Sequence, residues 1–173
     1  MKNKTITKKL VELKNEDQKL VTDLKAKKTD IAKLSRKHRA ELKKIIKKIG
    51  WPTISKVGKE GSQSAWLIAQ HSDRDVGFQE YCLNLMKSVS EGDVKSYHVA
   101  YLTDRILVNR RRKQIYGTQF FRNRKKELCY YPVRDFKNLE KRWKEMGVGG
   151  TTWKTQAAYH KAVIKLYQKD IKK

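Results

Sequence analysis

Several polar side chains between residues 71 and 119 stand beside large apolar residues, where a polar group needs a hydrogen-bond partner or a chemical task. Histidine exchanges a proton near neutral pH, arginine offers a two-pronged donor to phosphate or carboxylate, and glutamine and tyrosine supply neutral hydrogen bonds. These residue types predict an acid–base site. Its predicted catalytic residues are His71, Asp104 and Arg105, and its predicted substrate-binding residues are Asp75, Gln79, Tyr116 and Gln119. Asp104 or Asp75 is expected to orient the His71 ring.

The same residues also fit a buried polar network that fixes how helices and a hairpin dock, and this alternative stays open. Residues 72–75 hold a serine and an aspartate three apart, which is typical of a capping box that starts a helix. Asp75 would then be part of a helix cap. Asp104 and Arg105 would form a structural salt bridge.

Other kinds of chemistry have little support in the sequence. His71 and Asp75 are four residues apart, but the serine cap between them interrupts a common helix face, and the other histidines are scattered. No GxSxG motif is present, Cys129 falls in a predicted strand, and Cys82 lies in an apolar helical run. We therefore predict no metal site and no cofactor.

Five ordered strings run through the middle of the chain: GWPTISKVG, AWLIAQHSDRDVGFQ, AYLTDRILV, QIYGTQF and YYPVRDFKNLEKRWKEMG. Together they resemble an uncharacterised bacterial domain family, a domain of unknown function, with the signature GWP, QHxD, FQ, AYLxDR, YGTQ and YPxxD. The resemblance covers roughly residues 30 to 147. It implies a domain and candidate positions, among them the seven site residues, and it implies no reaction.

The charge of the chain is high and unevenly distributed. The 173 residues carry a net charge of +24, and residues 51–105 are nearly neutral while both flanks are strongly basic. Self-repulsion of this size favours a polyanionic partner, although a general bias toward lysine on solvated faces would give the same composition. The predicted nucleic-acid contacts lie on either side of the YGTQ string, at Arg110, Arg111, Arg112, Lys113, Arg122, Arg124, Lys125 and Lys126.

The elements that must position these residues begin with a long basic segment. Residues 5–49 contain no proline or glycine, and their apolar positions follow a heptad spacing, which predicts a coiled-coil-like N-terminal helical arm over residues 1–49. Alternatively, Thr29 and Asp30 cap a second helix, and the arm is a helical hairpin with a bend near Lys28. Only the stretch from about Ile31 onward is expected to pack on the globular part. The apolar stripe of the arm makes a homodimer possible.

Residues 50–173 are predicted to form a mainly helical globular domain. Residues 53–61 read as a loop, followed by helices near 62–71, 72–89, 96–109 and 138–146 and a last helix after Thr152. Two runs rich in β formers predict one small β hairpin near 114–133. The fold class is therefore mainly α.

The charge pattern predicts a nucleic-acid-binding protein that contacts phosphates of DNA or RNA without reading their sequence. The alternatives are an enzyme of unknown reaction at His71, Asp104 and Arg105, and a coiled-coil interaction protein. Mean hydropathy is -0.82, no run of about 20 apolar residues is present, and the start of the chain lacks the apolar core of a secretory signal. We therefore predict no membrane association and a cytoplasmic location.

Overall fold

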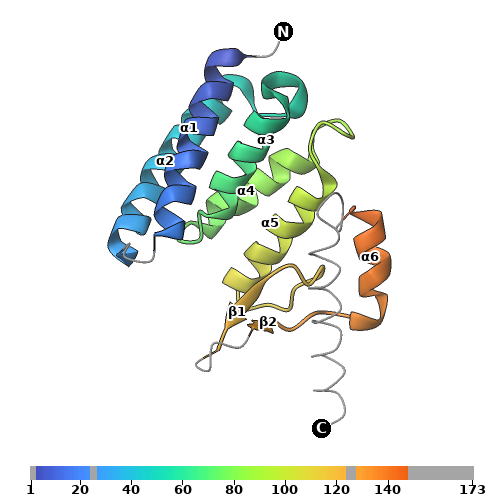
Figure 1. Cartoon of the computed structure of the whole chain (residues 1–173). Coiled ribbons are helices and arrows are strands. Elements are labelled where there is room, and N and C mark those ends of the chain that lie inside the picture. The colour runs from blue at the N-terminus through green and yellow to red at the C-terminus, as the bar shows by residue number, and fades with distance from the viewer. Residues whose placement is uncertain (1–2, 24–26, 124–127, 148–173) are drawn as a thin grey trace.

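The computed structural model describes residues 3–23, 27–123 and 128–147, and this part of the chain is mainly helical, as predicted. Figure 1 shows the longer helices packed together, with a short hairpin and a further helix at one end. The helices are α1 (Lys4–Thr22), α2 (Lys28–Ile49), α3 (Ile54–Gln70), α4 (Val76–Lys87), α5 (Ser96–Asn109), the 3-10 turn η1 (Phe136–Asn138) and α6 (Leu139–Glu145). The strands are β1 (Phe120–Arg122) and β2 (Leu128–Tyr130).

The N-terminal segment is a helical hairpin. The first helix ends at Thr22 and the second begins at Lys28, so the hairpin with a bend near Lys28 is the alternative found, although its second helix is capped at Lys27 and not at Thr29 or Asp30. Ile6, Leu10 and Leu13 of α1 are buried in the main core together with residues of α2, α3, α4 and α5. The expectation that only the stretch after Ile31 would pack on the globular part is therefore wrong. The homodimer stays a prediction, but the part of the apolar stripe formed by Ile6, Leu10 and Leu13 is covered by other helices of the same chain.

The start of α1 is tied to the start of α3. The backbone N–H of Asn3 donates to the carbonyl of Lys56 at 2.8 Å, and the hydroxyl of Thr7 donates to the carbonyl of Val57 at 2.9 Å. These bonds lie beside Gly58, whose positive φ of 74° interrupts the helical geometry inside α3. The sequence predicted a loop over residues 53–61, and the structure has instead two helical stretches that meet at a kink at Gly58, the first of them starting at Ile54.

The segment that follows the hairpin, together with α6, forms a second, smaller core on α5. Strands β1 and β2 are antiparallel, with Phe120 opposite Tyr130. The hairpin is confirmed, but its strands are shorter than the run of β formers over residues 114–133 indicated. Val133, Leu139 and Trp143 pack with Ala100 of α5, which places α6 beside that helix (Figure 1). The predicted helix after Thr152 lies outside the described residues.

His98, at the start of α5, leads to a prediction on pH. Its buried ring stacks on Trp66 with 4.1 Å between ring centroids, and burial lowers the pKa of the imidazole from 6.5 to about 3. Below pH 6.5 the unfolded chain binds a proton that the folded chain does not, so stability is lost as the pH falls. From this residue alone, the free energy of unfolding should be about 2 kcal/mol lower at pH 5 than at pH 7.

The measurement is urea unfolding of the wild type and of His98→Phe at both pH values, followed by tryptophan fluorescence. Phenylalanine fills a similar volume and carries no titratable group, so the variant should show a difference between the two pH values that is smaller by about 2 kcal/mol. An equal pH difference in both proteins would contradict the assignment of this effect to His98.

Candidate functional site

Asp104 organises the loop that carries the YGTQ string. Its carboxylate is fully buried on α5 and accepts hydrogen bonds from the backbone N–H groups of Ile115, Tyr116 and Thr118, at 2.7 to 3.1 Å, and from the Thr118 hydroxyl at 3.0 Å. Gly117 turns the loop with a positive φ of 62°, close against Leu139. Burial raises the pKa of the Asp104 carboxyl, and the backbone bonds oppose this shift. Asp104 thus fixes the backbone of this loop by hydrogen bonds, and it does not orient His71.

Gln114 and Gln119 connect this loop to the hairpin. Buried Gln114 donates from Nε2 to the carbonyls of Gln119 and Tyr131 at 3.1 and 2.7 Å, and it accepts from the backbone N–H of Gln119 at 2.9 Å. Gln119 in turn donates from its side chain to the Tyr101 carbonyl at 3.4 Å. These bonds satisfy the loop internally, which explains why a segment rich in β formers is not a strand.

A second group of polar residues gathers around Asp73, in the turn between α3 and α4. Arg105 donates to both Asp73 oxygens, at 2.7 and 2.5 Å, and also to Oε1 of Gln119 at 3.1 Å. Asn109 donates one bond to Asp73 and one to Gln79, both at 3.0 Å. Burial alone would raise the pKa of Asp73, but the bonds from Arg105, Asn109 and Gln79 outweigh it and keep that pKa below its ordinary value.

Gln79 lies completely buried below this cluster. Its side-chain amide donates to the carbonyls of Ala69 and Gln70 at 3.3 and 3.1 Å, where α3 ends, and to Asp73 at 3.4 Å. Gln79 therefore satisfies carbonyls that the end of a helix leaves without intrahelical partners. Its contacts account for its burial without any ligand.

His71 has a partner that the sequence did not suggest. Its Nδ1 lies 2.6 Å from Oδ2 of Asp17, which is buried on α1, 54 positions earlier in the chain. Gln18 also donates to this carboxylate oxygen, at 3.2 Å. The predicted orientation of His71 by Asp104 or Asp75 is wrong, because both carboxylates are engaged elsewhere.

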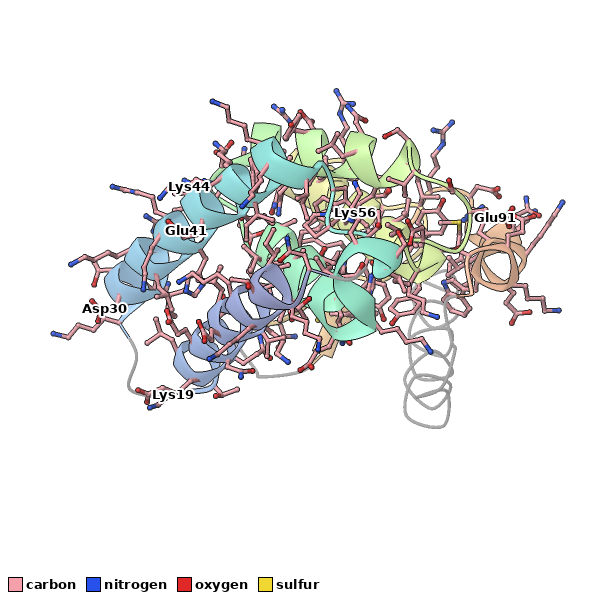
Figure 2. The ribbon with its side chains drawn as sticks, turned by 90° about the horizontal axis from the view of Figure 1, so that it is seen from above. Lys19, Asp30, Glu41, Lys44, Lys56 and Glu91 are labelled. Atoms are coloured by element: carbon pink, nitrogen blue, oxygen red, sulfur yellow. The ribbon has the colours of Figure 1, made fainter. Side chains whose placement is uncertain are left out.

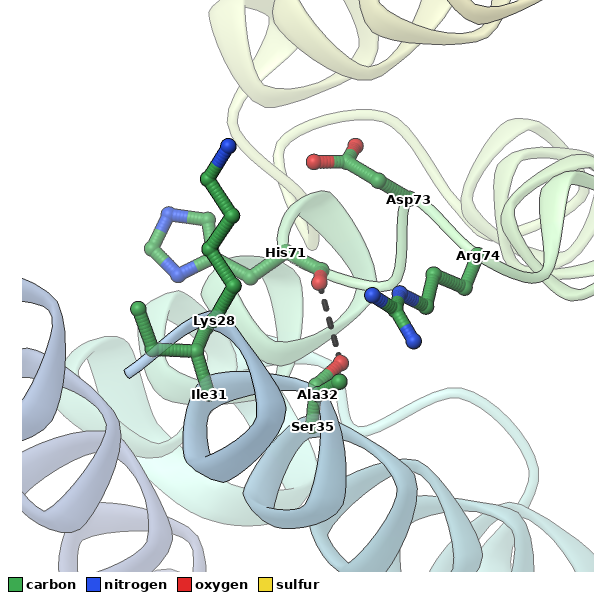
Figure 3. Close-up of a pocket in the computed structure, with 7 residues that line it drawn as sticks. All are labelled: Lys28, Ile31, Ala32, Ser35, His71, Asp73 and Arg74. Atoms are coloured by element: carbon green, nitrogen blue, oxygen red, sulfur yellow. Dashed lines mark hydrogen bonds between the residues drawn. The ribbon is translucent and has the colours of Figure 1, made fainter. Parts of the chain in front are cut away.

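A cavity of about 210 Å³ opens beside His71. Figure 3 shows that one of its walls comes from α2 and the other from the turn after α3, with a hydrogen bond from the Ser35 hydroxyl to the His71 carbonyl joining the two. The lining residues are Lys28, Ile31, Ala32, Ser35, His71, Asp73 and Arg74. Asp73 therefore belongs both to this cavity and to the cluster with Arg105.

Asp75 caps α4. Its carboxylate accepts the N–H of Phe78 at 3.0 Å and pairs with Arg39 and Lys43 of α2 at 3.1 and 3.4 Å. The helix therefore starts after Asp75, three residues later than a box beginning at Ser72 would place it. Burial would raise the pKa of Asp75, but the bonds to Phe78 and the cations keep it below its ordinary value.

Tyr116 takes part mainly through its backbone. Its carbonyl accepts a bond of 2.6 Å from the Trp143 ring nitrogen, and its N–H donates to Asp104. The half-buried phenol has a raised pKa, owing first to burial and then to the charge of Asp104. The seven predicted residues thus divide between the Asp104 loop, the Asp73 cluster, the Asp75 cap and the His71 cavity, and do not share one pocket.

The predicted nucleic-acid contacts are described only in part. Arg110 pairs with Glu80 at 3.0 Å, whereas Arg111, Arg112 and Lys113 are exposed and form no ion pair with any described residue. Arg124, Lys125 and Lys126 lie outside the described residues, and the side chain of Arg122 is not described.

Some residues with a clear role in these groups were not predicted: Asp17, Asp73, Asn109 and Gln114. Asp73 is the aspartate of the QHxD string, which was a usable signal, while Asp17 gives no local sign of its partner. Within the described ranges, no three His, Cys, Asp or Glu side chains are grouped so that they could hold a metal ion. Nor does any described helix combine the length and apolar character that crossing a membrane requires.

Comparison with known families gives a match over most of the chain. The model of a family of unknown function (DUF6624) matches residues 9–155, which includes most of α1 as well as all the strings noted in the sequence. No curated protein and no solved structure matches the chain.

Proposed function

Since this chain belongs to the family of unknown function (DUF6624), whose description states no reaction, we propose a function from its own surface: it binds nucleic acid through sequence-independent contacts to phosphates. The observation that carries the proposal is a row of exposed cations on α2 that no described acidic residue neutralises. The row consists of Lys33, Arg36, Lys47 and Lys48.

The spacing of this row suits a polyanion. Lys33 and Arg36 are three residues apart, and Lys47 follows Arg36 after eleven residues, which is about three turns, so these three side chains lie on one side of the helix with Lys48 beside them. At about 1.5 Å per residue the row is about 22 Å long, which spans about six phosphates of one DNA strand. In Figure 2, α2 lies along one edge of the molecule, where it is open to a large partner.

The neighbouring charges on α2 are partly balanced. Lys37 pairs with Glu16 at 3.2 Å, Lys43 with Asp75 at 3.4 Å, and Lys44 with Glu41 at 2.7 Å. Surface pairs of this kind stabilise a protein by at most about 1 kcal/mol and exchange readily for a phosphate. Lysine outnumbers arginine here, which favours contacts with the phosphate backbone over readout of bases.

A second basic segment carries an exposed aromatic ring. Phe121 of β1 is 41% exposed and lies against Tyr131 with 5.0 Å between ring centroids. It follows the exposed cations at 111–113 in the chain. Aromatic faces beside cations stack on unpaired bases, so single-stranded probes belong in any binding test. We also propose a cytoplasmic location, where nucleic acid is available and where the buried Cys82 would remain a thiol.

The test is the salt dependence of binding to mixed-sequence double-stranded DNA, single-stranded DNA and RNA. For duplex DNA, the logarithm of the binding constant should fall with the logarithm of salt concentration with a slope of about -0.9 per phosphate contact. Replacing Lys33, Arg36, Lys47 and Lys48 with glutamine should reduce the magnitude of that slope by up to about 3.6.

A matched control also replaces three lysines and one arginine, but at exposed positions outside the row. Lys59, Lys87, Lys95 and Arg134 form no side-chain ion pair with any described residue, and their replacement by glutamine should leave the slope unchanged. The proposal fails if the wild type does not bind at low salt, if its binding does not respond to salt, or if both fourfold variants lose affinity equally.

A further inference from the structure

The cavity beside His71 has features that the proposed function does not use. Nδ1 of His71 lies 2.6 Å from the Asp17 carboxylate, so this contact orients the ring and leaves Nε2 as the ring nitrogen that can meet a ligand. Nε2 has no hydrogen-bond partner among the described residues, and the His71 side chain, which lines the cavity, is 25% exposed. A buried carboxylate behind an accessible imidazole is an arrangement suited to proton exchange.

The charges around the cavity select an anion. Lys28 and Arg74 line it and form no ion pair with any described residue. The one carboxylate in the lining, Asp73, is balanced by the two bonds from Arg105. In Figure 3 the side chains of Lys28 and His71 lie on one side of the pocket and that of Arg74 on the other, so cations stand on both sides of the space.

The volume and the proton chemistry narrow the choice of anion. About 210 Å³ corresponds to about seven water molecules of liquid, which is enough room for a phosphate group. A phosphate monoester approaches two negative charges near neutral pH and has a second pKa of about 6, close to that of an ordinary imidazole. A phosphodiester carries one charge and no such proton.

We propose that this cavity binds the phosphate group of a phosphate monoester. Lys28 and Arg74 balance its charge, and Nε2 of His71 shares one proton with a phosphate oxygen while Asp17 holds the ring in place. The monoester belongs either to a small molecule or to the end of a nucleic-acid strand. The inference does not depend on the proposed function, because none of the cavity residues belongs to the cation row of α2.

The test follows the ring signals of His71 by NMR, identified by their absence in His71→Gln, while inorganic phosphate is added at constant ionic strength. We expect saturable shifts with a dissociation constant of about 1 mM or below. The double variant Lys28→Gln with Arg74→Gln should weaken binding at least about tenfold. The control Lys59→Gln with Arg134→Gln removes the same charges elsewhere and should bind phosphate like the wild type, with thermal unfolding confirming that both variants fold.

Three outcomes overturn the proposal. The first is the absence of a saturable shift of the His71 signals up to about 10 mM phosphate, and the second is an equal loss of phosphate affinity in both double variants. The third is that a 5′-hydroxyl oligonucleotide shifts these signals as much as its 5′-phosphorylated counterpart does. A nucleoside 5′-monophosphate and a 5′-phosphorylated oligonucleotide distinguish the two sources of the group. If the nucleoside monophosphate and the phosphorylated oligonucleotide bind equally, the cavity recognises the monoester group alone. If the oligonucleotide binds more tightly, the ligand is the end of a nucleic-acid strand. If the cavity does not bind phosphate, the salt-dependent binding of nucleic acid is unaffected. If nucleic acid does not bind, phosphate binding in the cavity is likewise unaffected.

Discussion

Replacing Asp104 with alanine is expected to lower the free energy of unfolding by about 3–5 kcal/mol. The substitution leaves the backbone N–H groups of Ile115, Tyr116 and Thr118 buried or half-buried without their acceptor. A buried donor that loses its partner costs about 1–3 kcal/mol, and partial collapse of the loop recovers some of the total. Urea denaturation of the full chain, followed by circular dichroism, measures the difference.

Two variants make this result interpretable. Asp30→Ala removes an exposed aspartate from the first turn of α2 and should change stability by no more than about 1 kcal/mol. His71→Gln should unfold close to the wild type, because its ring is partly exposed and its partner Asp17 keeps a bond from Gln18. If Asp104→Ala unfolds like the wild type, its carboxylate is not the structural anchor described here, and the predicted catalytic role regains its support.

Shortening Leu13 of α1 to alanine should cost about 2–5 kcal/mol of stability. Leu13 has no exposed surface and lies in the same core as residues of α3, α4 and α5, so the truncation leaves a cavity that the surrounding helices cannot fully close. Leu20→Ala, on the same helix but only partly buried, is the matched control and should cost less. The measurement is again urea denaturation.

Equal and small effects of these two leucine variants would contradict the packing of α1 in the core. They would instead support an N-terminal arm that is solvated or that pairs with a second copy. Sedimentation of the wild type and Leu13→Ala would then show whether a dimer forms through the apolar stripe. A single cooperative unfolding transition in the wild type, shared by α1 and the rest of the chain, is the expected behaviour.

Local signals predicted the helices well. Gly50 followed by Trp51 and Pro52 marks the end of α2, and the helix predicted over residues 96–109 has the same bounds as α5. The heptad stripe of α1 was ambiguous for a physical reason: packing against a second chain and packing against helices of the same chain require the same apolar spacing. Only tertiary contacts distinguish them, and they lie about 50 residues away.

The sequence predicted which polar residues make specific contacts, but it did not predict which residues they contact. The strings located His71, Gln79, Asp104, Arg105 and Gln119, all of which make specific polar contacts. Side-chain pairing depends on how helices pack, and grouping the residues because they fall in the same set of strings misled the prediction that Asp104 or Asp75 would orient His71. The loop over residues 114–119 shows the same limit, since one buried carboxylate on another helix overrides its β propensity.

The contact between α1 and α3 has a consequence for synthesis of the chain on the ribosome. At about 5–20 residues per second, α1 is complete several seconds before the residues that cover Leu10 and Leu13 are made. Until then only α2 is available to shield this apolar surface. We therefore expect the nascent chain to be most prone to aggregation or chaperone capture between completion of α2 and emergence of α3.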